Sequence, residues 1–365
     1  MIEVNKIYNE DALSLLKRMD DNSIDCVVTS PPYFNLRLYT DSDKEIGRER
    51  TPTEYIDNLV EVFVEVYRVL KPTGTVWANI GDTYNGNKTG NTNEKWKNVN
   101  IDDFKKEKWN GCKNKDLIGI PWLLAFALRA RCGFYLRQDI IWDKSGNAMP
   151  ESVKDRCVKS HEYIFFLTKS EKYYFDYQAI QEPAKTFENR PFGIVRQRYF
   201  DYDTKQSREP EKYGISTGIR FGGKKYGDND SPQFATKSGK EWKPQMKNLH
   251  RDGQTVQGMH KNRAEGGKDE VYAARNKRDV WSVNTQPSNI EHCAMYPEKL
   301  IMPCILAGCP EGGVVYDPFL GSGTTALAVI HSIGSRKFIG SELSKEYAEI
   351  ARKRIEPELN QLTLF

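Results

Sequence analysis

The sequence predicts an α/β fold, a mostly parallel sheet with helices on its faces, and an irregular inserted region. Short apolar runs alternate with segments of helical periodicity in both end regions of the chain, as in chains that cross over between parallel strands. Two of these runs end in unusual turns, TSPPY at 29–33 and DPFLGSG at 317–323. The length of 365 residues suits one large domain that carries an insertion.

The first half of the chain is expected to supply most of the sheet. The stretch Thr51-Pro52-Thr53-Glu54 is a capping box with proline at the first helical position, and apolar residues follow it with helical spacing as far as Leu70. A second helix is expected from Pro121 to Cys132, ended by Gly133. A long polar loop is expected at 81–115. Apolar runs predict strands at 24–29, 75–80, 136–142 and 163–168.

The alternation returns after Trp281 and continues to the end of the chain. Helices are expected at 298–307, 324–332 and 345–355, and strands at 313–316 and 337–341. We therefore expect residues 1–182 and 279–365 to form two halves of one core.

The segment between these halves has no sustained periodicity and a different charge. Residues 183–278 contain 21 Lys and Arg against 12 Asp and Glu, a balance of +9, whereas the rest of the chain balances at −5. A basic module on a nearly neutral body indicates a polyanionic partner, although a solvated charged segment would look the same. We expect 183–278 to be an inserted module of irregular structure.

Composition excludes several classes of protein. The sequence has no long uncharged apolar run, so no membrane span is expected. Acidic residues in MIEVNKIYNED stand where a signal peptide would be basic. The seven cysteines show no CxxC pairing and no metal-ligand spacing with the five histidines, which predicts reduced thiols, a cytoplasmic location and no metal site.

The TSPPY stretch ends a buried strand with two prolines. Proline cannot continue a sheet ladder, and the second proline restricts the backbone of the first. The chain therefore leaves the strand as a stiff arm that presents the Ser30 hydroxyl, the Pro31 carbonyl and the Tyr33 ring. A rigid structural turn is the alternative for this stretch taken alone.

The DPFLGSGTT stretch joins a strand to a helix through a glycine-rich turn. Gly321 and Gly323 allow a tight turn and a close approach of a ligand to the backbone, and the following helix offers free N–H groups. About twenty residues on, Glu342 follows the next strand, where a carboxylate can accept both hydroxyls of a ribose. The pattern predicts an adenosine-containing ligand.

The two motifs together resemble the amino-group DNA methyltransferases that use S-adenosylmethionine. In that family a D/N/S-P-P-Y/F motif is catalytic and an F-x-G-x-G motif binds the cofactor. Here the catalytic motif comes first, the cofactor motif last and the basic segment between them, which is similar to the β group. The resemblance implies a Rossmann-like methyltransferase sheet with 183–278 as the DNA target-recognition region.

The same resemblance implies the site residues. The catalytic residues would be Ser30, Pro31, Pro32 and Tyr33. The cofactor-binding residues would be Asp11, Asp317, Pro318, Phe319, Gly321, Ser322, Gly323, Thr324 and Glu342, with Asp11 at the adenine. The segment MYPEKLIMPCILAG would help to close the methionine side of the cofactor pocket, and Asp82 would lie near the cofactor or substrate entry. Glu151, Arg156 and His161 are more readily explained as structural.

The residues suggest how such a reaction would proceed. If Ser30 and the Pro31 carbonyl both accept hydrogen bonds from an exocyclic amino group, the nitrogen lone pair is freed to attack an electrophilic methyl group. The base would be flipped out of double-stranded DNA and stacked on Tyr33. Within the family, serine at the first catalytic position is usual for N4-cytosine enzymes, so that target is favoured over N6-adenine.

Other interpretations stay open from the sequence alone. C5-cytosine methylation would need a reactive thiolate, but Cys304 lies in an apolar helix, where it is expected to pack in the core. An NAD-dependent oxidoreductase would explain the glycines but not the SPPY motif. A DNA-binding protein that has lost catalysis would not need either motif, and both are intact here. Members of this group often form homodimers and act beside a cognate restriction endonuclease, and the sequence decides neither point.

Overall fold

The computed structural model describes residues 2–34, 42, 44–85, 111–144, 146, 152–183, 274–285 and 295–362, together with short strands between 199 and 242. By its internal contacts the chain divides into two units. One unit consists of Met1–Gln181 and Asn276–Phe365, and the other of Glu182–Arg275. Most of the loop expected at 81–115 lies outside the described residues.

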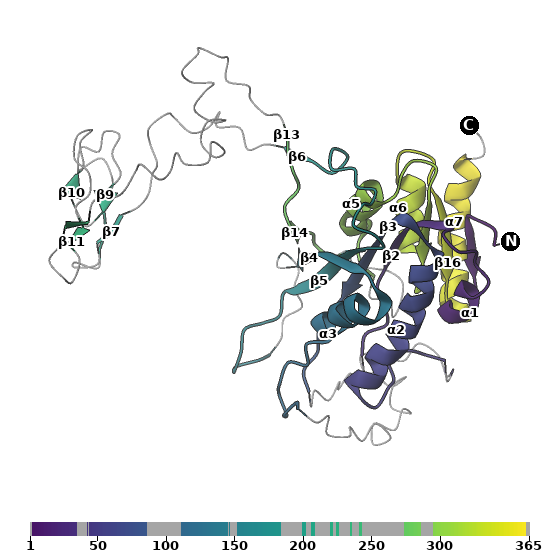
Figure 1. Ribbon diagram of the computed structural model, residues 1–365, viewed down its shortest axis with the longest axis horizontal. Helices are drawn as coiled ribbons and strands as arrows, with labels where there is room; N and C mark the ends of the chain where they lie inside the picture. Colours follow the sequence, from purple (N-terminus) through teal and green to yellow (C-terminus); the bar gives the residue numbers. More distant parts are fainter. Residues whose placement is uncertain are drawn as a thin grey trace, which may run out of the picture. The chain divides into compact units, whose positions relative to one another are not determined.

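The first unit is built on an eight-stranded sheet (Figure 1). All neighbouring pairs are parallel except those that β5 makes with β3 and β4, so β5 alone runs against the others. The prediction of a mostly parallel α/β sheet is confirmed. In spatial order the strands are β1 (Lys6–Tyr8), β16 (Lys337–Ser341), β15 (Val314–Asp317), β2 (Ile24–Thr29), β3 (Leu70–Ile80), β5 (His161–Thr168), β4 (Tyr135–Asp143) and β14 (Val280–Ser282).

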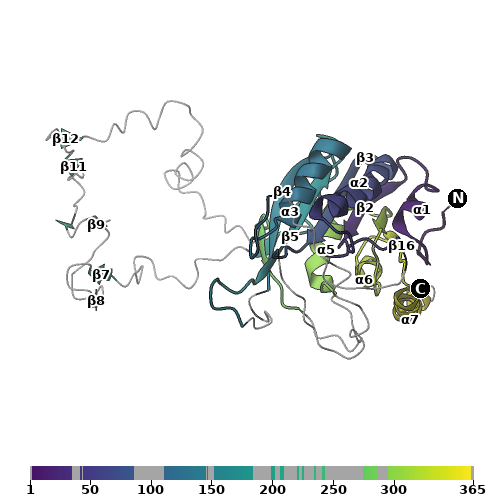
Figure 2. The ribbon, with the colours of Figure 1, turned by 90° about the horizontal axis from the view of Figure 1, so that it is seen from below.

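Helices cover both faces of this sheet, and Figure 2 shows the sheet between the two helical layers. One face packs against α1 (Ala12–Leu16), α2 (Pro52–Val69) and α3 (Ile120–Ala127), and the other against α5 (Glu298–Gly308), α6 (Thr324–His331) and α7 (Lys345–Leu362). Strand residues alternate between the two cores: Val27 packs with the first set, and Cys26 and Val28 pack with the second. All six residues of β2 are buried, which explains its continuous apolar pattern.

The predicted helix starts and stops are largely as expected. The Thr51 hydroxyl accepts a bond from the Glu54 backbone N–H, and the Glu54 carboxylate accepts one from the Thr51 N–H, which is the reciprocal capping box. The segment 120–132 is helical but changes to a π-turn at Leu128–Cys132 before Gly133 ends it at φ +85°.

Three elements differ from the sequence-based expectation. Strand β1 was not predicted, because three residues give too short a pattern to register as a strand. Strand β3 begins at Leu70, which was expected to end the preceding helix, and not at residue 75, since Ile24 of β2 pairs with Leu70 before a bulge. Helix α7 continues to Leu362 and carries Pro357 within it, seven residues beyond the predicted end.

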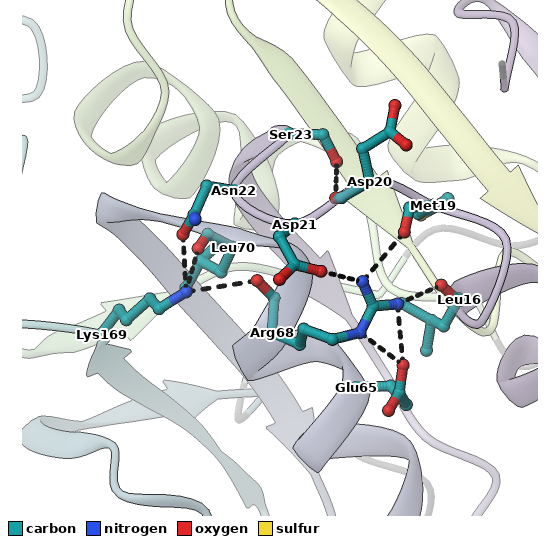
Figure 3. A network of polar contacts seen from close by, with 10 residues as sticks. All are labelled: Leu16, Met19, Asp20, Asp21, Asn22, Ser23, Glu65, Arg68, Leu70 and Lys169. Atoms are coloured by element: carbon teal, nitrogen blue, oxygen red, sulfur yellow. Dashed lines mark hydrogen bonds and ion pairs between the residues drawn. The ribbon is translucent and has the colours of Figure 1, made fainter.

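A polar network around Arg68 and Lys169 lies at the amino edge of the sheet, where the parallel strands β2 and β3 begin (Figure 3). The Arg68 guanidinium donates to the Leu16 and Met19 carbonyls at 2.7 and 3.0 Å. It also forms ion pairs with Asp21 and Glu65. The Lys169 ammonium donates to the Leu70 carbonyl at 2.6 Å, to the Asn22 side chain and to the Arg68 carbonyl. The network joins the end of α2 to the turn before β2.

The second unit is described only in its short strands. Strands β6 (Glu182–Pro183) and β13 (Ala274–Arg275) pair antiparallel where the chain leaves and re-enters the first unit. The other pairs are β7 (Tyr199–Asp201) with β8 (Gln206–Arg208), β9 (Arg220–Phe221) with β10 (Lys224–Lys225), and β11 (Phe234–Ala235) with β12 (Glu241–Trp242). None of the described helices is long and apolar enough to span a membrane.

Candidate active site

The predicted site residues gather at the carboxyl edge of the sheet. Strands β2, β3, β15 and β16 run parallel and end at this edge, whereas the antiparallel β5 begins there. The SPPY arm follows β2, the DPFLGSG turn follows β15 and Glu342 follows β16. The two motifs, almost 300 residues apart in sequence, therefore leave adjacent strands, β2 and β15.

The SPPY arm is held by helix α2. The Tyr55 hydroxyl donates to the Pro32 carbonyl at 2.7 Å, and Tyr55 itself is fully buried. Pro31 is buried, and Ser30 is partly exposed. Within the described part of the chain, no donor reaches the Pro31 carbonyl. The arm thus leaves one main-chain acceptor beside the Ser30 hydroxyl, as its two prolines predict.

Tyr33 is anchored by its hydroxyl group. This hydroxyl donates to the Glu162 carboxylate at 2.6 Å and lies 3.2 Å from Asn79 Oδ1. The ring lies against Gly81, where an added Cβ would come within 2.8 Å of Tyr33 Cε2. Gly81 therefore provides the room that the ring occupies beside the end of β3.

Two functional candidates at this edge were missed by sequence reasoning, Asn79 and Glu162. Asn79 is 3% exposed at the end of β3, and its Oδ1 accepts the Ser30 hydroxyl at 3.4 Å. Glu162 lies at the start of β5 and pairs with Lys144 beyond the end of β4. A polar residue in an apolar strand pattern was the available signal, in WANIGD and in SHEYIFF.

Asp317 organises the start of the glycine turn at 317–323. Its carboxylate accepts bonds from the Thr29 hydroxyl at 2.6 Å and the Phe319 N–H at 3.0 Å, and from the Tyr296 and Thr325 hydroxyls. Burial raises the pKa of this carboxyl, although these hydrogen bonds oppose the shift. Asp317 thus joins β15 to β2 and to helix α6. Any effect of Asp317 on cofactor binding would act at least partly through this scaffold.

The two glycines of the turn have different surroundings. Gly323, at φ +89°, precedes α6, and a Cβ there would come within 3.1 Å of the Ala351 Cβ and 2.9 Å of Ile355. Gly321, at φ +56°, faces open space, with no atom within 4 Å of an added Cβ. The open space over the Gly321 main chain is what a close ligand approach requires, so the turn fits an adenosine-containing cofactor.

Glu342 lies directly beside that open space. Its carboxylate accepts the Gly321 N–H and the Ser344 N–H, each at 2.8 Å. Burial raises its pKa to about 7, while the two backbone hydrogen bonds act in the opposite direction. A ligand with two adjacent hydroxyls would supply the donors that favour the ionised form.

The remaining residues of the turn are held by the protein. The Pro318 carbonyl accepts the Ser341 hydroxyl at 2.9 Å, and Phe319 contributes its N–H to Asp317. The Ser322 hydroxyl donates to Met295, and Arg354 donates to Ser322. Thr324 is buried in the first turn of α6. Met295 belongs to the MYPEKLIMPCILAG segment, which therefore contacts the turn, and its role at the methionine side of a cofactor pocket stays a prediction.

Asp11 and Asp82 both act as helix caps. The Asp11 carboxylate caps α1 by accepting the Ser14 N–H at 3.0 Å, and it pairs with Lys44 at 2.9 Å. Burial would raise the Asp11 pKa, but these two bonds together lower it. Asp82 accepts the N–H groups of Gly119 and Ile120 at the start of α3. The predicted cofactor role of Asp11 remains a prediction.

The residues expected to be structural have varied outcomes. Arg156 stacks over the Tyr84 ring at 4.1 Å and donates to the Cys157 carbonyl. His161 packs edge-on against Tyr163. Glu151 lies outside the described residues. Cys304 is fully buried in α5, and burial raises the pKa of its thiol, so the expectation of core packing is confirmed.

A family model described as DNA methylase, of the N6/N4 methyltransferase type, matches residues 24–353. The chain belongs to this DNA methylase family. The match spans both the SPPY arm and the DPFLGSG turn. It confirms the resemblance drawn from the two motifs and decides against the oxidoreductase interpretation.

Similar proteins agree with this assignment. The chain is 37% identical over 353 residues to the Type II methyltransferase M.Cfr9I of Citrobacter freundii, covering 96% of this chain and 88% of the relative. It is 35% identical to the Type II methyltransferase M.SmaI of Serratia marcescens, covering 96% and 90%. Among solved structures, a PvuII DNA methyltransferase described as cytosine-N4-specific superposes with a TM-score of 0.54 at 16% identity, over 99% of this chain and 93% of that one.

These findings identify the protein as a DNA methyltransferase with the Rossmann-like methyltransferase fold. Its methyl donor is S-adenosylmethionine, the cofactor of the family, and the turn around Gly321 fits an adenosine-containing group.

Proposed function

We propose that the protein transfers the methyl group of S-adenosylmethionine to the exocyclic N4 of cytosine at specific sites in double-stranded DNA. The observation that carries this proposal is the pair of acceptors after β2. The Ser30 hydroxyl oxygen and the Pro31 carbonyl stand at neighbouring positions, and within the described residues no protein donor contacts either one. An exocyclic amino group has two hydrogens, one for each acceptor.

These acceptors would make the amino nitrogen nucleophilic. Its lone pair is normally delocalised into the ring, and two hydrogen bonds draw the nitrogen toward tetrahedral geometry. Bound S-adenosylmethionine would supply an electrophilic methyl group. The contribution of the protein is to hold the nitrogen in position and to stabilise developing charge, effects worth several kcal/mol in well-organised sites. The neutral Ser30 is no effective base near pH 7, so the proton passes to solvent after transfer.

The target base must leave the duplex to reach this edge. Flipping costs a few kcal/mol of unstacking, and stacking on the Tyr33 ring would return about 1–3 kcal/mol. The basic segment 183–278 would hold the DNA through phosphate contacts and read the sequence through base edges. Pro32 would act by fixing the backbone of Pro31.

Serine at position 30 favours cytosine over adenine. Serine is usual at this position in the N4-cytosine enzymes of the family, and Asp or Asn in its N6-adenine enzymes. N6-adenine methylation with the same fold and mechanism is the second candidate, because both bases present an amino group beside a ring nitrogen.

The cofactor is proposed to contact residues at three neighbouring strand ends. Its ribose hydroxyls would donate to Glu342, its adenine would lie near Asp11, and the main chain at Gly321 would line the pocket. Pro318, Phe319, Ser322, Gly323 and Thr324 would shape the turn around it.

The Type II names of the relatives support a wider role. We propose that the enzyme acts in the cytoplasm and protects DNA against a cognate restriction endonuclease. A homodimer is a further proposal, which sedimentation of the purified protein would test. DNA methylated by the enzyme should resist an endonuclease that cuts unmethylated DNA at the same sites.

The decisive experiment identifies the methylated nucleoside. The protein is incubated with methyl-labelled S-adenosylmethionine and unmethylated DNA of mixed sequence, and the DNA is digested and analysed by mass spectrometry. N4-methylcytosine is expected. N6-methyladenine would keep the mechanism and overturn the target base. Cofactor binding without any labelled nucleoside would point to another substrate, such as RNA, or to a recognition site that the test DNA lacked.

A further inference from the structure

We propose that Glu162 is a positioning residue that orients the Ser30 hydroxyl for catalysis through the side-chain amide of Asn79. The inference rests on the proposed function of Ser30 as an acceptor for the target amino group. It concerns a carboxylate from the start of β5, a strand that carries neither motif.

The orientation of the Asn79 amide follows from its neighbours. Its Nδ2 group lies 3.1 Å from the Tyr163 carbonyl and 3.3 Å from Glu162 Oε2. A carbonyl and a carboxylate only accept hydrogen bonds, so the amide nitrogen must face them. The Asn79 carbonyl oxygen therefore faces Ser30 and Tyr33.

Glu162 also binds the Tyr33 hydroxyl, which would otherwise compete with Ser30 as a donor to Asn79 Oδ1. The single hydroxyl hydrogen of Tyr33 can be donated to Glu162 at 2.6 Å or to Asn79 Oδ1 at 3.2 Å, and the shorter, charge-assisted bond is the stronger one. Asn79 Oδ1 is then left for the Ser30 hydroxyl at 3.4 Å. With its hydrogen directed to Asn79, the Ser30 oxygen keeps its lone pairs available to accept.

This direction matters for the reaction. A serine hydroxyl can donate or accept, and only the accepting orientation frees the lone pair of the target nitrogen. Lys144, in its ion pair with Glu162 Oε1, holds the carboxylate in place from the end of β4. The Glu162 side chain is 13% exposed, so its bonds compete little with water.

The test is a cycle of variants read by single-turnover methylation of PCR-amplified DNA of mixed sequence. Glu162→Gln keeps the size of the side chain but weakens its bonds to Tyr33 and Lys144. We expect a 10- to 100-fold slower methyl-transfer step with unchanged binding of S-adenosylmethionine and DNA. In the Ser30→Ala background the same change should alter the residual rate by less than about 3-fold, because the group through which Glu162 acts is gone.

Glu65→Gln is the matched control. Glu65 is an ion-paired carboxylate of similar burial, 22% exposed, at the opposite edge of the sheet. This variant should methylate at the wild-type rate. Glu162→Asp is the second test variant, since it keeps the charge but withdraws the carboxylate by one methylene, and a slower step is expected from it as well.

Three results would overturn the inference. Wild-type rates in both Glu162 variants would show that the carboxylate positions nothing. An equal loss in the Ser30→Ala background would show that Glu162 acts independently of Ser30. A loss that follows reduced thermal stability and reduced cofactor binding would mark a purely structural role. Absence of methylated product from the wild-type enzyme would instead refute the proposed function.

Discussion

The two edges of the central sheet use polar side chains in opposite ways. At the amino edge, Arg68 and Lys169 direct their donors to backbone carbonyls and carboxylates of the protein itself (Figure 3). At the carboxyl edge, the Ser30 oxygen and the Pro31 carbonyl meet no protein donor in the described residues, and Gly321 faces open space. The described donors of the amino edge are paired within the protein, whereas the carboxyl edge also presents acceptors without a protein donor, which we propose are used by ligands.

The largest difference between substitutions at the two edges is expected for the serines that flank β2, Ser30 and Ser23. Ser30→Ala removes an acceptor that would be used in the transition state, so we expect about a 10²- to 10³-fold slower methyl transfer, the usual effect of losing one such group. Cofactor binding and the melting temperature should not change. Single-turnover methylation and calorimetric titration measure the two effects.

Ser23→Ala is the control for this comparison. Ser23 lies just before β2, and its hydroxyl donates to the Asp20 carbonyl at 2.7 Å. Its loss should leave the methylation rate intact. Equal rates for Ser30→Ala and the wild type would remove Ser30 from the mechanism.

The next largest effect separates the two glycines of the cofactor turn. Gly323→Ala combines a positive φ with a clash against α7, and we expect a loss of about 2–4 kcal/mol of unfolding free energy. Gly321→Ala carries only the backbone strain, about 1 kcal/mol, but places a methyl group in the open space. Its main effect should be weaker S-adenosylmethionine binding.

Chemical denaturation and calorimetric titration of both variants test this expectation. If Gly321→Ala binds the cofactor as tightly as the wild type, then the open space over that residue is not part of the pocket.

At the amino edge, Arg68→Ala should affect stability alone. The change removes the Arg68 donor from the Met19 carbonyl and one of the two donors from the Leu16 carbonyl, which keeps the Met19 N–H. It also leaves two carboxylates without their partner, and we expect a cost of about 2–3 kcal/mol. Arg131→Ala breaks an ion pair whose partners are both about half exposed, and should cost under about 1 kcal/mol. Urea unfolding measures both, and the methylation rate per folded molecule should stay constant. A large loss of methylation rate in Arg68→Ala would contradict the expectation that the amino edge contributes to stability alone.

Sequence reasoning succeeded where a feature was local. The capping box at Thr51, the proline-terminated strand β2 and the glycine turn each depend on neighbouring residues, and all appear as expected. These local signals also place the two motifs at one sheet edge, because parallel strands end together.

The parts that were missed depend on long-range pairing. The three residues of β1 form a strand only because β16 lies beside them. Asn79 and Glu162 meet because β5 runs antiparallel to β3, and neither residue type predicts this direction. The caps formed by Asp82 and Asp11 show the converse: a carboxylate near a motif can be occupied by helix N–H groups.

The smallest expected effect is a pH dependence of stability and of cofactor affinity that arises from the Glu342 carboxyl. Its pKa of about 7 lies above the ordinary 4.5, because burial penalises the charged form. The stability contributed by the neutral carboxyl is fully present below about pH 4.5 and is lost as pH rises toward 7. Ribose hydroxyls would favour the ionised form, so the affinity for S-adenosylmethionine should instead rise as the pH passes through 7, by about tenfold between pH 6 and pH 8. Calorimetric titration without DNA measures this affinity, and Glu342→Gln should bind more weakly at pH 8 with a flat profile. If the affinity of the wild type does not change with pH, then Glu342 accepts hydrogen bonds only from the Gly321 and Ser344 N–H groups. Its role would then be structural, like that of the carboxylates that pair with Arg68.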